Sequence, residues 1–134
     1  MTQFHLKIVT PDGLRYDGMA ESLTVRTANG DLGILARHTN CVAPLGMGEA
    51  SVVLDGKRRT GACIGGMVSV LEGEVTVVAT TFEWAEDIDR ARAHASEEAA
   101  RQAMAEKNAS ATQLELASAK LKRALIRQSV YDRK

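Results

Sequence analysis

The stretch Ala85-Glu86-Asp87-Ile88-Asp89-Arg90-Ala91-Arg92-Ala93 separates two parts of the sequence that differ in composition. All eleven glycines and both prolines lie before Ala79, and neither residue type occurs from Ala85 to Lys134. Glycine and proline disfavour helix interiors and mark turns. We therefore predict two structural units in this chain of 134 residues, a β-rich domain over residues 1–84 and a helical unit over residues 85–134.

Short segments of alternating polarity fill the first part. Phe4, Leu6 and Ile8 alternate with His5 and Lys7, as in a strand with one buried face. Turn signals recur roughly every 8–12 residues, and no helical segment lies between the strands to make crossovers. We expect an antiparallel ten-stranded β-sandwich or barrel. The segments expected as strands are 4–8, 14–16, 23–27, 32–35, 41–45, 50–54, 57–64, 67–71 and 74–79, with Gly65-Gly66 forming a turn.

The second part is rich in alanine, the residue with the highest helix propensity. We expect a first helix from Ala85 to about Glu106. A second helix is expected from Thr112, where Thr112-x-x-Glu115 has the spacing of a capping box, and Ser110-x-x-Gln113 is a competing start. A linker of about five residues favours an antiparallel helix-turn-helix hairpin.

The second predicted helix carries two apolar stripes, although the sequence offers it only one partner helix. Either a single static packing buries both stripes, or one stripe packs on the β domain or on another protein. The stripes consist of Leu114, Ala117, Leu121 and Leu125 on one side and Leu116, Ala119, Ile126 and Val130 on the other.

Composition excludes several functional classes. Seventeen basic and seventeen acidic residues give no net charge, which argues against nucleic-acid binding. No apolar run approaches the roughly 18 residues needed to span a bilayer, and the first residues lack the apolar core of a signal peptide. We expect a cytosolic protein, or a peripheral one on the cytosolic face of a membrane. Cys41 and Cys63 are expected to be reduced, buried thiols rather than a disulfide or a metal site.

Four segments together resemble the epsilon subunit of bacterial F-type ATP synthases, and in this order the resemblance covers the whole chain. These segments are Leu6-Lys7-Ile8-Val9-Thr10-Pro11-Asp12-Gly13, then Gly30-Asp31-Leu32-Gly33-Ile34-Leu35 followed by Arg37-His38, then Gly65-Gly66, and finally Glu86-Asp87-Ile88-Asp89-Arg90-Ala91-Arg92-Ala93.

The resemblance implies a non-catalytic rotor subunit. In that family the β-sandwich joins the gamma subunit of the central stalk to the c-ring of the membrane sector. The helical hairpin folds down on the sandwich or extends along gamma to the alpha/beta catalytic head, where it inhibits ATP hydrolysis. The resemblance thus implies a peripheral protein at the cytoplasmic face of the cell membrane, without direct membrane insertion.

The resemblance also implies that ATP is a regulatory ligand. Ile88-Asp89-x-x-Arg92-Ala93 matches a motif that binds ATP in some bacterial epsilon subunits, and Glu83, Arg123 and Arg127 align with residues near the nucleotide. We expect Asp89 and Arg92 to share a helical face, the carboxylate accepting from adenine or ribose and the guanidinium binding phosphate. The alternative is a surface ion pair, with the arginines contacting gamma or the head. The family also has an arginine late in the first helix, and Arg101 is the nearest candidate here, although its spacing does not align cleanly.

Three residues are candidates for partner contacts implied by the resemblance. His38 falls on a family histidine near gamma, and Gly30 and Asp31 lie in the hairpin that resembles the rotor-ring contact. The alternatives are a surface-loop histidine and a solvent-exposed turn. No catalytic set is evident, because His5, His38 and His94 lack metal-ligand spacing and no Gly-x-x-x-x-Gly-Lys loop occurs. A free-standing nucleotide-sensing β-sandwich is the alternative function.

Overall fold

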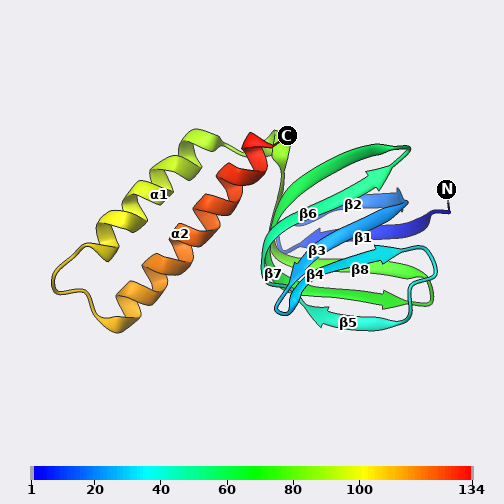
Figure 1. The fold of residues 1–134 in the computed structure, drawn as a ribbon, viewed down its shortest axis with the longest axis horizontal. Helices are drawn as coiled ribbons and strands as arrows, with labels where there is room; N and C mark the ends of the chain where they lie inside the picture. The colour runs from blue at the N-terminus through cyan, green and yellow to red at the C-terminus, as the bar shows by residue number, and fades with distance from the viewer. Residues whose placement is uncertain (1, 134) are drawn as a thin grey trace. The chain divides into compact units, whose positions relative to one another are not determined.

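The computed structural model describes residues 2–133 and contains two compact units, the first ending at Trp84 and the second beginning at Ala85. The first unit is built from strands and the second from helices (Figure 1). A β-sandwich-like sheet followed by a helical hairpin confirms the predicted α+β fold class. The strands are β1 (Phe4–Thr10), β2 (Gly13–Ala20), β3 (Ser22–Thr27), β4 (Gly30–Leu35), β5 (Cys41–Pro44), β6 (Met47–Leu54), β7 (Lys57–Leu71) and β8 (Glu74–Trp84).

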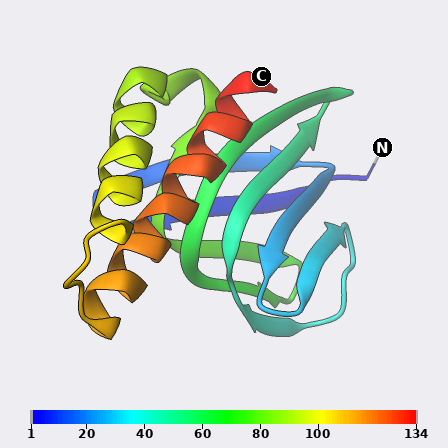
Figure 2. The ribbon, with the colours of Figure 1, turned by 60° about the vertical axis from the view of Figure 1, so that its left-hand side comes forward.

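The eight strands form one sheet in the order β2-β1-β8-β7-β6-β3-β4, with β5 paired to β7 off this path. The sheet curls so that its strands lie in two layers around a common core (Figure 2). Every second residue of β1 faces this core, as the alternation in the sequence predicts. Burial of each large core side chain contributes roughly 1.5–3 kcal/mol. The largest fully buried side chains of this unit are Leu6, Ile8, Leu23, Val25, Ile34, Val68, Val70 and Val77.

The sandwich has eight strands rather than ten, and β7 is the main reason. Gly65-Gly66, which was expected to form a turn, instead bends a continuous strand that runs from Lys57 to Leu71. Both glycines have positive φ, +68° and +104°, so the chain changes direction without ending the strand. The first half of β7 pairs with β6, the second half pairs with β5, and β8 follows β7 beyond Ala79 to Trp84.

One strand pair contradicts the expectation of purely antiparallel sheets. β1 and β8 are parallel, with His5 opposite Glu74 and Val9 opposite Val78. Parallel neighbours need a long connection, but it need not be a helix. Here the first and last strands of the unit are connected by all the strands between them.

His5 connects three strands on the outer face of the sheet. Its Nε2 lies 2.6 Å from an Asp17 oxygen on β2, and its Nδ1 lies 2.6 Å from a Glu74 oxygen on β8. A neutral imidazole has one N–H and cannot donate to both carboxylates, so this geometry favours the imidazolium. Hydrogen bonds to Asp17 and then Glu74 raise the pKa of His5 above its usual value. Lys7, on the same strand face and paired with Asp17, is the other charged neighbour.

We expect the contribution of His5 to stability to depend on pH. Because its folded-state pKa is raised, the contribution is complete below the unfolded pKa of about 6.5 and is lost as pH rises through the folded value. The difference in unfolding free energy between wild type and His5→Gln should therefore shrink from about pH 5 to about pH 9 in urea titrations. Lys7→Gln should show no such change in that range, and a pH-independent effect of His5→Gln would contradict the assignment.

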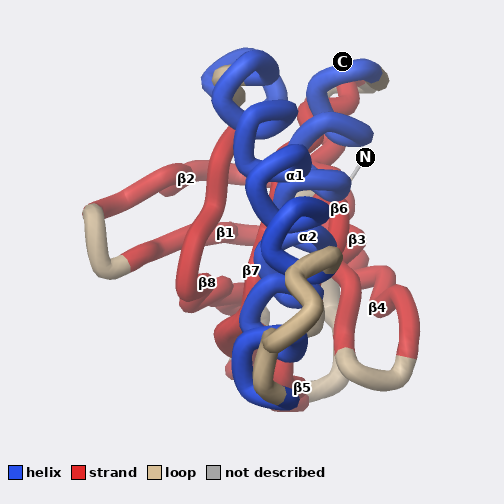
Figure 3. The backbone as a smooth tube through the Cα atoms, turned by 90° about the vertical axis from the view of Figure 1, so that its left-hand side faces the viewer, coloured by secondary structure: helices blue, strands red, loops and turns tan. Residues whose placement is uncertain are grey.

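The second unit contains a short 3-10 helix, η1 (Ala85–Asp87), followed by α1 (Arg90–Met104) and α2 (Ala111–Asp132). Figure 3 shows α1 and α2 running side by side as a hairpin. The first α-helix therefore begins five residues later than the expected start at Ala85. The second begins after Ser110, whose hydroxyl accepts from Gln113 N while the Gln113 side chain accepts from Ser110 N. The competing capping box is thus the one used, and the expected start at Thr112 is wrong.

Two polar contacts fasten the helices to each other. The Arg90 guanidinium donates to both carboxylate oxygens of Asp132 at 2.9 and 3.3 Å. Gln128 Nε2 donates to Glu97 Oε1 at 2.8 Å, and Gln128 is itself buried. These contacts set the antiparallel register of the hairpin. Within residues 2–133 no helix is both long and apolar enough to cross a membrane.

Candidate functional site

An apolar row crosses the outer face of the β-sandwich on five neighbouring strands. Strand register places Leu14 opposite Val9, Val9 opposite Val78, Val78 opposite Met67, and Met67 opposite Pro44. These side chains point away from the core because their strand neighbours, such as Ile8 and Val68, are fully buried. Leu14, Val78 and Met67 are 55%, 53% and 48% exposed. The apolar row is defined here as Leu14, Val9, Val78, Met67 and Pro44.

Five apolar residues aligned across a sheet differ from the isolated apolar residues found on most surfaces. Single exposed hydrophobic residues are ordinary, whereas a contiguous exposed set marks a surface that another molecule covers. Val42, two residues before Pro44 on β5, is 64% exposed and adds to the same side of the strand. The row is held by paired strands and is therefore a preformed surface. This arrangement suits a broad apolar protein contact.

The β3–β4 hairpin lies next to one end of the row. Ala28 N donates to Pro44 O at 3.4 Å, and Thr27 forms a bridge with Leu45, the residue after Pro44. Gly30 follows with a φ of +116°, which favours glycine at this position. The Asp31 carboxylate pairs with Arg26 at 3.0 Å, so it is not an isolated charge on a solvent turn.

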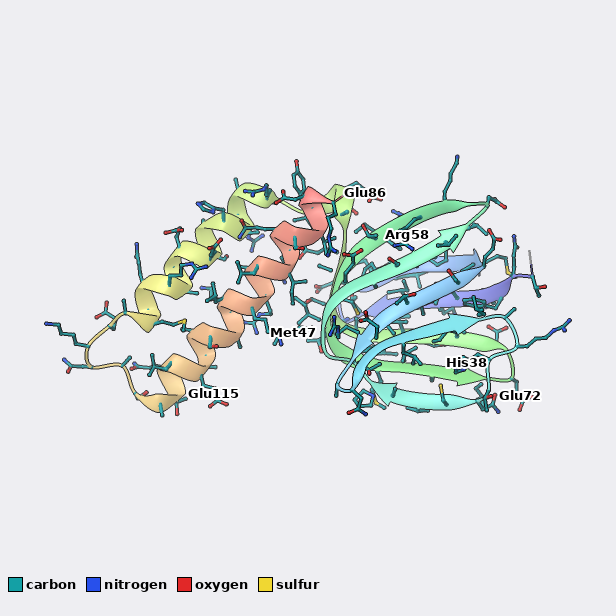
Figure 4. All side chains as sticks on the ribbon, viewed as in Figure 1. His38, Met47, Arg58, Glu72, Glu86 and Glu115 are labelled. Carbon is teal, nitrogen blue, oxygen red and sulfur yellow. The ribbon has the colours of Figure 1, made fainter. Side chains whose placement is uncertain are left out.

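His38 lies at the opposite end of β5 from Pro44. It follows Arg37, a residue with a φ of +66°, in the loop after β4, and its backbone N–H donates to Leu35 O. Its Nδ1 lies 2.8 Å from Thr39 O, which requires that nitrogen to carry the proton. Figure 4 shows His38 at the same end of the first unit as Glu72. The structure therefore separates His38 from Gly30 and Asp31 by the length of β4 and β5.

The residues predicted to bind nucleotide are divided between the two units. Glu83 lies on β8, in register with Ala62, and the other residues lie in the helical unit. Ile88 and Ala93 are buried, whereas Asp89 and Arg92 are exposed. The side chains of Ile88 and Ala93 are therefore largely covered by the protein itself, unlike those of Asp89 and Arg92.

Asp89 lies directly before α1 and not within the helix, where it was expected. It is the N-cap of the helix, and its Oδ1 accepts from the backbone N–H of Arg92 at 3.0 Å. Among the described residues no ion pair joins the Asp89 carboxylate to the Arg92 guanidinium, so the surface-ion-pair alternative does not fit.

The arginines of α2 lie farther along the hairpin than Arg92. Because Gln128 is opposite Glu97, the adjacent Arg127 is level with the third turn of α1, roughly 9 Å along the axis from Arg92. Arg123 lies one further turn away and is half-buried. Arg101 donates to Glu97 Oε2 at 2.9 Å, so its guanidinium is engaged within α1. A ligand that contacted Arg92, Arg127 and Arg123 would therefore extend roughly 15 Å along the helix axes.

The electrostatics of this unit also depend on four residues that were not predicted as site residues, namely Arg90, Glu97, Gln128 and Asp132. Hydrogen bonding from Arg90 lowers the pKa of Asp132, and the pKa of Glu97 is lowered by hydrogen bonds from Gln128 and Arg101. The Glu97–Arg101 spacing of four residues was a visible signal in the sequence. The cross-helix partners were not visible, because only the register of the hairpin brings them together.

A hollow of about 330 Å³ lies between the helices toward the turn of the hairpin. It is lined mainly by alanines, together with Leu116, Glu106, Gln113 and Lys120, and none of the predicted nucleotide-binding residues lines it. Alanine side chains allow the two helices to approach closely, but near the turn of the hairpin the helices do not fill the space between them.

Comparisons with known proteins agree over the whole chain. The family model described as ATP synthase, Delta/Epsilon chain, beta-sandwich domain matches residues 3–85. The chain is 39% identical over 136 residues to the ATP synthase epsilon chain of Ruminococcus albus, with both chains fully covered. It is 36% identical over 134 residues to that of Shouchella clausii, with 100% of this chain and 98% of the relative covered. The Bacillus subtilis epsilon chain is 42% identical over 102 residues, covering 76% and 77%.

Solved structures resemble the chain in fold. A chain of the Euglena gracilis mitochondrial ATP synthase, in a structure of OSCP, F1 and the c-ring, gives a TM-score of 0.70 at 22% identity, covering 98% of this chain and 79% of that one. A chain of the Tetrahymena thermophila mitochondrial ATP synthase central stalk and c-ring gives 0.63 at 13% identity, covering 97% of each. At these identities the similarity is one of fold.

Proposed function

The chain belongs to the ATP synthase delta/epsilon family, and we propose that it is a non-catalytic subunit of the central stalk, joining the gamma subunit to the membrane c-ring. Full-length similarity to bacterial epsilon chains supports this role. In this proposal the protein is peripheral to the cell membrane on its cytoplasmic face, as part of the synthase complex.

The apolar row is the observation that carries the proposal. A subunit that rotates together with the central stalk needs a rigid, broad contact with it. The row presents apolar side chains on five strands of a preformed sheet. We assign this surface to the gamma subunit, and we assign His38, at the other end of β5 from Pro44, to a separate contact with gamma. The Gly30–Asp31 hairpin, adjacent to Pro44, is assigned to the c-ring. Co-purification of the chain with gamma from native membranes tests the role, and recovery of the chain free of the synthase would favour the stand-alone nucleotide sensor.

The helical hairpin is assigned as a regulatory arm with two states, one of which extends toward the alpha/beta head and inhibits hydrolysis. ATP bound to the hairpin shifts the population toward the permissive state by its differential affinity. The exposure of Leu114, Leu116 and Leu125 on α2 supports a second set of contacts for this arm. Glu83, in the first unit, stays a prediction from the family resemblance.

The nucleotide assignment predicts a strong effect of Arg92. Its guanidinium is exposed on the first turn of α1, and a charge-assisted hydrogen bond to phosphate is worth about 1.5–3 kcal/mol. Arg92→Ala should therefore weaken ATP binding by at least about tenfold in a calorimetric titration. Arg58→Ala, at an exposed arginine of the first unit, serves as the control and should bind normally. No heat from the wild type at millimolar ATP would remove the sensor and leave the stalk role intact.

The arm assignment predicts the effect of a truncation. Deleting the chain after Glu86 removes both α-helices and leaves the complete β-sandwich. The shortened chain should still join gamma, because the apolar row is intact, and the ATPase rate of the assembled complex should rise several-fold. An unchanged ATPase rate would show that the arm does not inhibit in this protein.

A further inference from the structure

Asp89 is the N-cap of α1. It has an extended backbone, with φ −85° and ψ 98°, directly before the first residue of α1. Its side chain accepts from Arg92 N at 3.0 Å, and its carbonyl accepts from Ala93 N at 3.0 Å. The residue therefore satisfies two backbone donors of the motif's own arginine and alanine.

The first turn of α1 carries charges that are unfavourable at a helix N-terminus. The first turn contains Arg90 and Arg92 and no acidic residue, so two cations lie at the positive end of the helix dipole. Arg90 is compensated by Asp132 on α2. Within residues 2–133 no carboxylate pairs with the Arg92 guanidinium, and the only acidic group bonded to this residue holds its backbone.

We infer that Asp89 is a positioning residue of the nucleotide site: it caps α1 and so fixes Arg92, and it does not contact the nucleotide itself. This inference rests on the ATP binding proposed above. It changes what the motif requires at position 89, because a cap needs a short side chain with a hydrogen-bond acceptor and not a negative charge. Serine and asparagine meet that requirement, alanine does not, and glutamate keeps the charge on a longer side chain that is not a preferred cap.

A comparison of four proteins distinguishes capping of α1 by Asp89 from direct contact between Asp89 and the nucleotide. The four are wild type, Asp89→Ser, Asp89→Ala and Asp89→Glu. Calorimetric titration with ATP should give Asp89→Ser an affinity within about threefold of wild type, whereas Asp89→Ala and Asp89→Glu should each lose about fivefold or more. Hydrogen exchange of the Arg92 amide, measured on the same full-length chains without ATP, should be slow in wild type and Asp89→Ser and fast in the other two. Rescue by serine is the signature that a ligand-contacting carboxylate would not give.

Several results would overturn the inference. It fails if Asp89→Ser binds ATP as weakly as Asp89→Ala, or if Asp89→Glu alone retains wild-type affinity, because either result assigns the carboxylate to the nucleotide. It also fails if Asp89→Ala binds as well as wild type. A wild type that binds no ATP at millimolar concentration overturns the ATP-sensing proposal together with this inference. Binding by wild type with loss in Asp89→Ser overturns the inference alone.

Discussion

Replacing Gly66 with alanine should destabilise the β-sandwich by about 3–5 kcal/mol, the combined cost of a forbidden backbone conformation and a steric clash. Gly66 has a φ of +104°, which an L-residue with a side chain rarely adopts. A Cβ at this position would overlap Val78 O and lie 2.8 Å from Ala79 Cα on the neighbouring strand. Both obstacles are backbone atoms and cannot rotate away. The bend that carries β7 from β6 to β5 therefore depends on glycine here.

Two further glycines separate the causes of this effect. Gly73 has a φ of +80°, but a methyl group added there would meet open space, so Gly73→Ala should cost only the conformational part, about 1–2 kcal/mol. Gly33 has neither obstacle, and Gly33→Ala should change stability by less than about 1 kcal/mol. Urea unfolding followed by the fluorescence of Trp84, the only tryptophan in the sequence, measures all three. Equal midpoints for Gly66→Ala and Gly33→Ala would contradict this account of the bend.

Replacing the central residues of the apolar row with charged ones should strongly weaken binding to the gamma subunit. Met67 and Val78 are cross-strand neighbours at its centre, and the double change Met67→Lys with Val78→Glu replaces them by an opposite-charge pair without altering net charge. Such a pair is tolerated on an exposed sheet face, so the fold should be retained. At an interface the two charges would lose their water, and the dissociation constant for gamma should rise by at least about 100-fold.

Met19→Lys is the matched control for this variant. Met19 is 43% exposed on β2 and is paired with His5, outside the row. Its replacement should leave the dissociation constant for gamma within about threefold of the wild-type value, as expected for a residue outside the central contact. A double variant that still binds gamma like wild type, with an unchanged unfolding midpoint, would exclude the row as the binding surface.

Local signals in the sequence were sufficient for the fold class and for most of the core. The alternation of Phe4, Leu6 and Ile8 identified the buried face of β1, and the loss of glycine and proline after Ala79 indicated the change to helix. The parallel pairing of His5 with Glu74 joins residues 69 positions apart, and alternation identifies a strand's faces without naming its neighbours. The apolar row could not be predicted from the sequence for the same reason, because its members are known to be adjacent only when the register between the strands is known.

Local ambiguity explains the remaining errors. A Gly-Gly pair permits a turn or a bend, and in β7 the pairing with two different strands selects the bend. Two capping boxes overlap at the start of α2, and the sequence does not rank Ser110 above Thr112. At Asp89 the sequence fits a cap and a ligand equally well, since an aspartate before a helix suits both. These choices depend on tertiary context rather than on composition.

Oxidation of native methionines by peroxide tests the central claim, that the apolar row binds gamma, without any substitution. Met67 in the row and Met19 outside it are similarly exposed, at 48% and 43%, so their oxidation rates in the free chain should be comparable. In complex with gamma, mass spectrometry should show oxidation of Met67 slowed by at least about tenfold, with Met19 unchanged, because a covered core of an interface excludes water. An undiminished rate at Met67 in the complex would show that gamma binds elsewhere and would contradict the account.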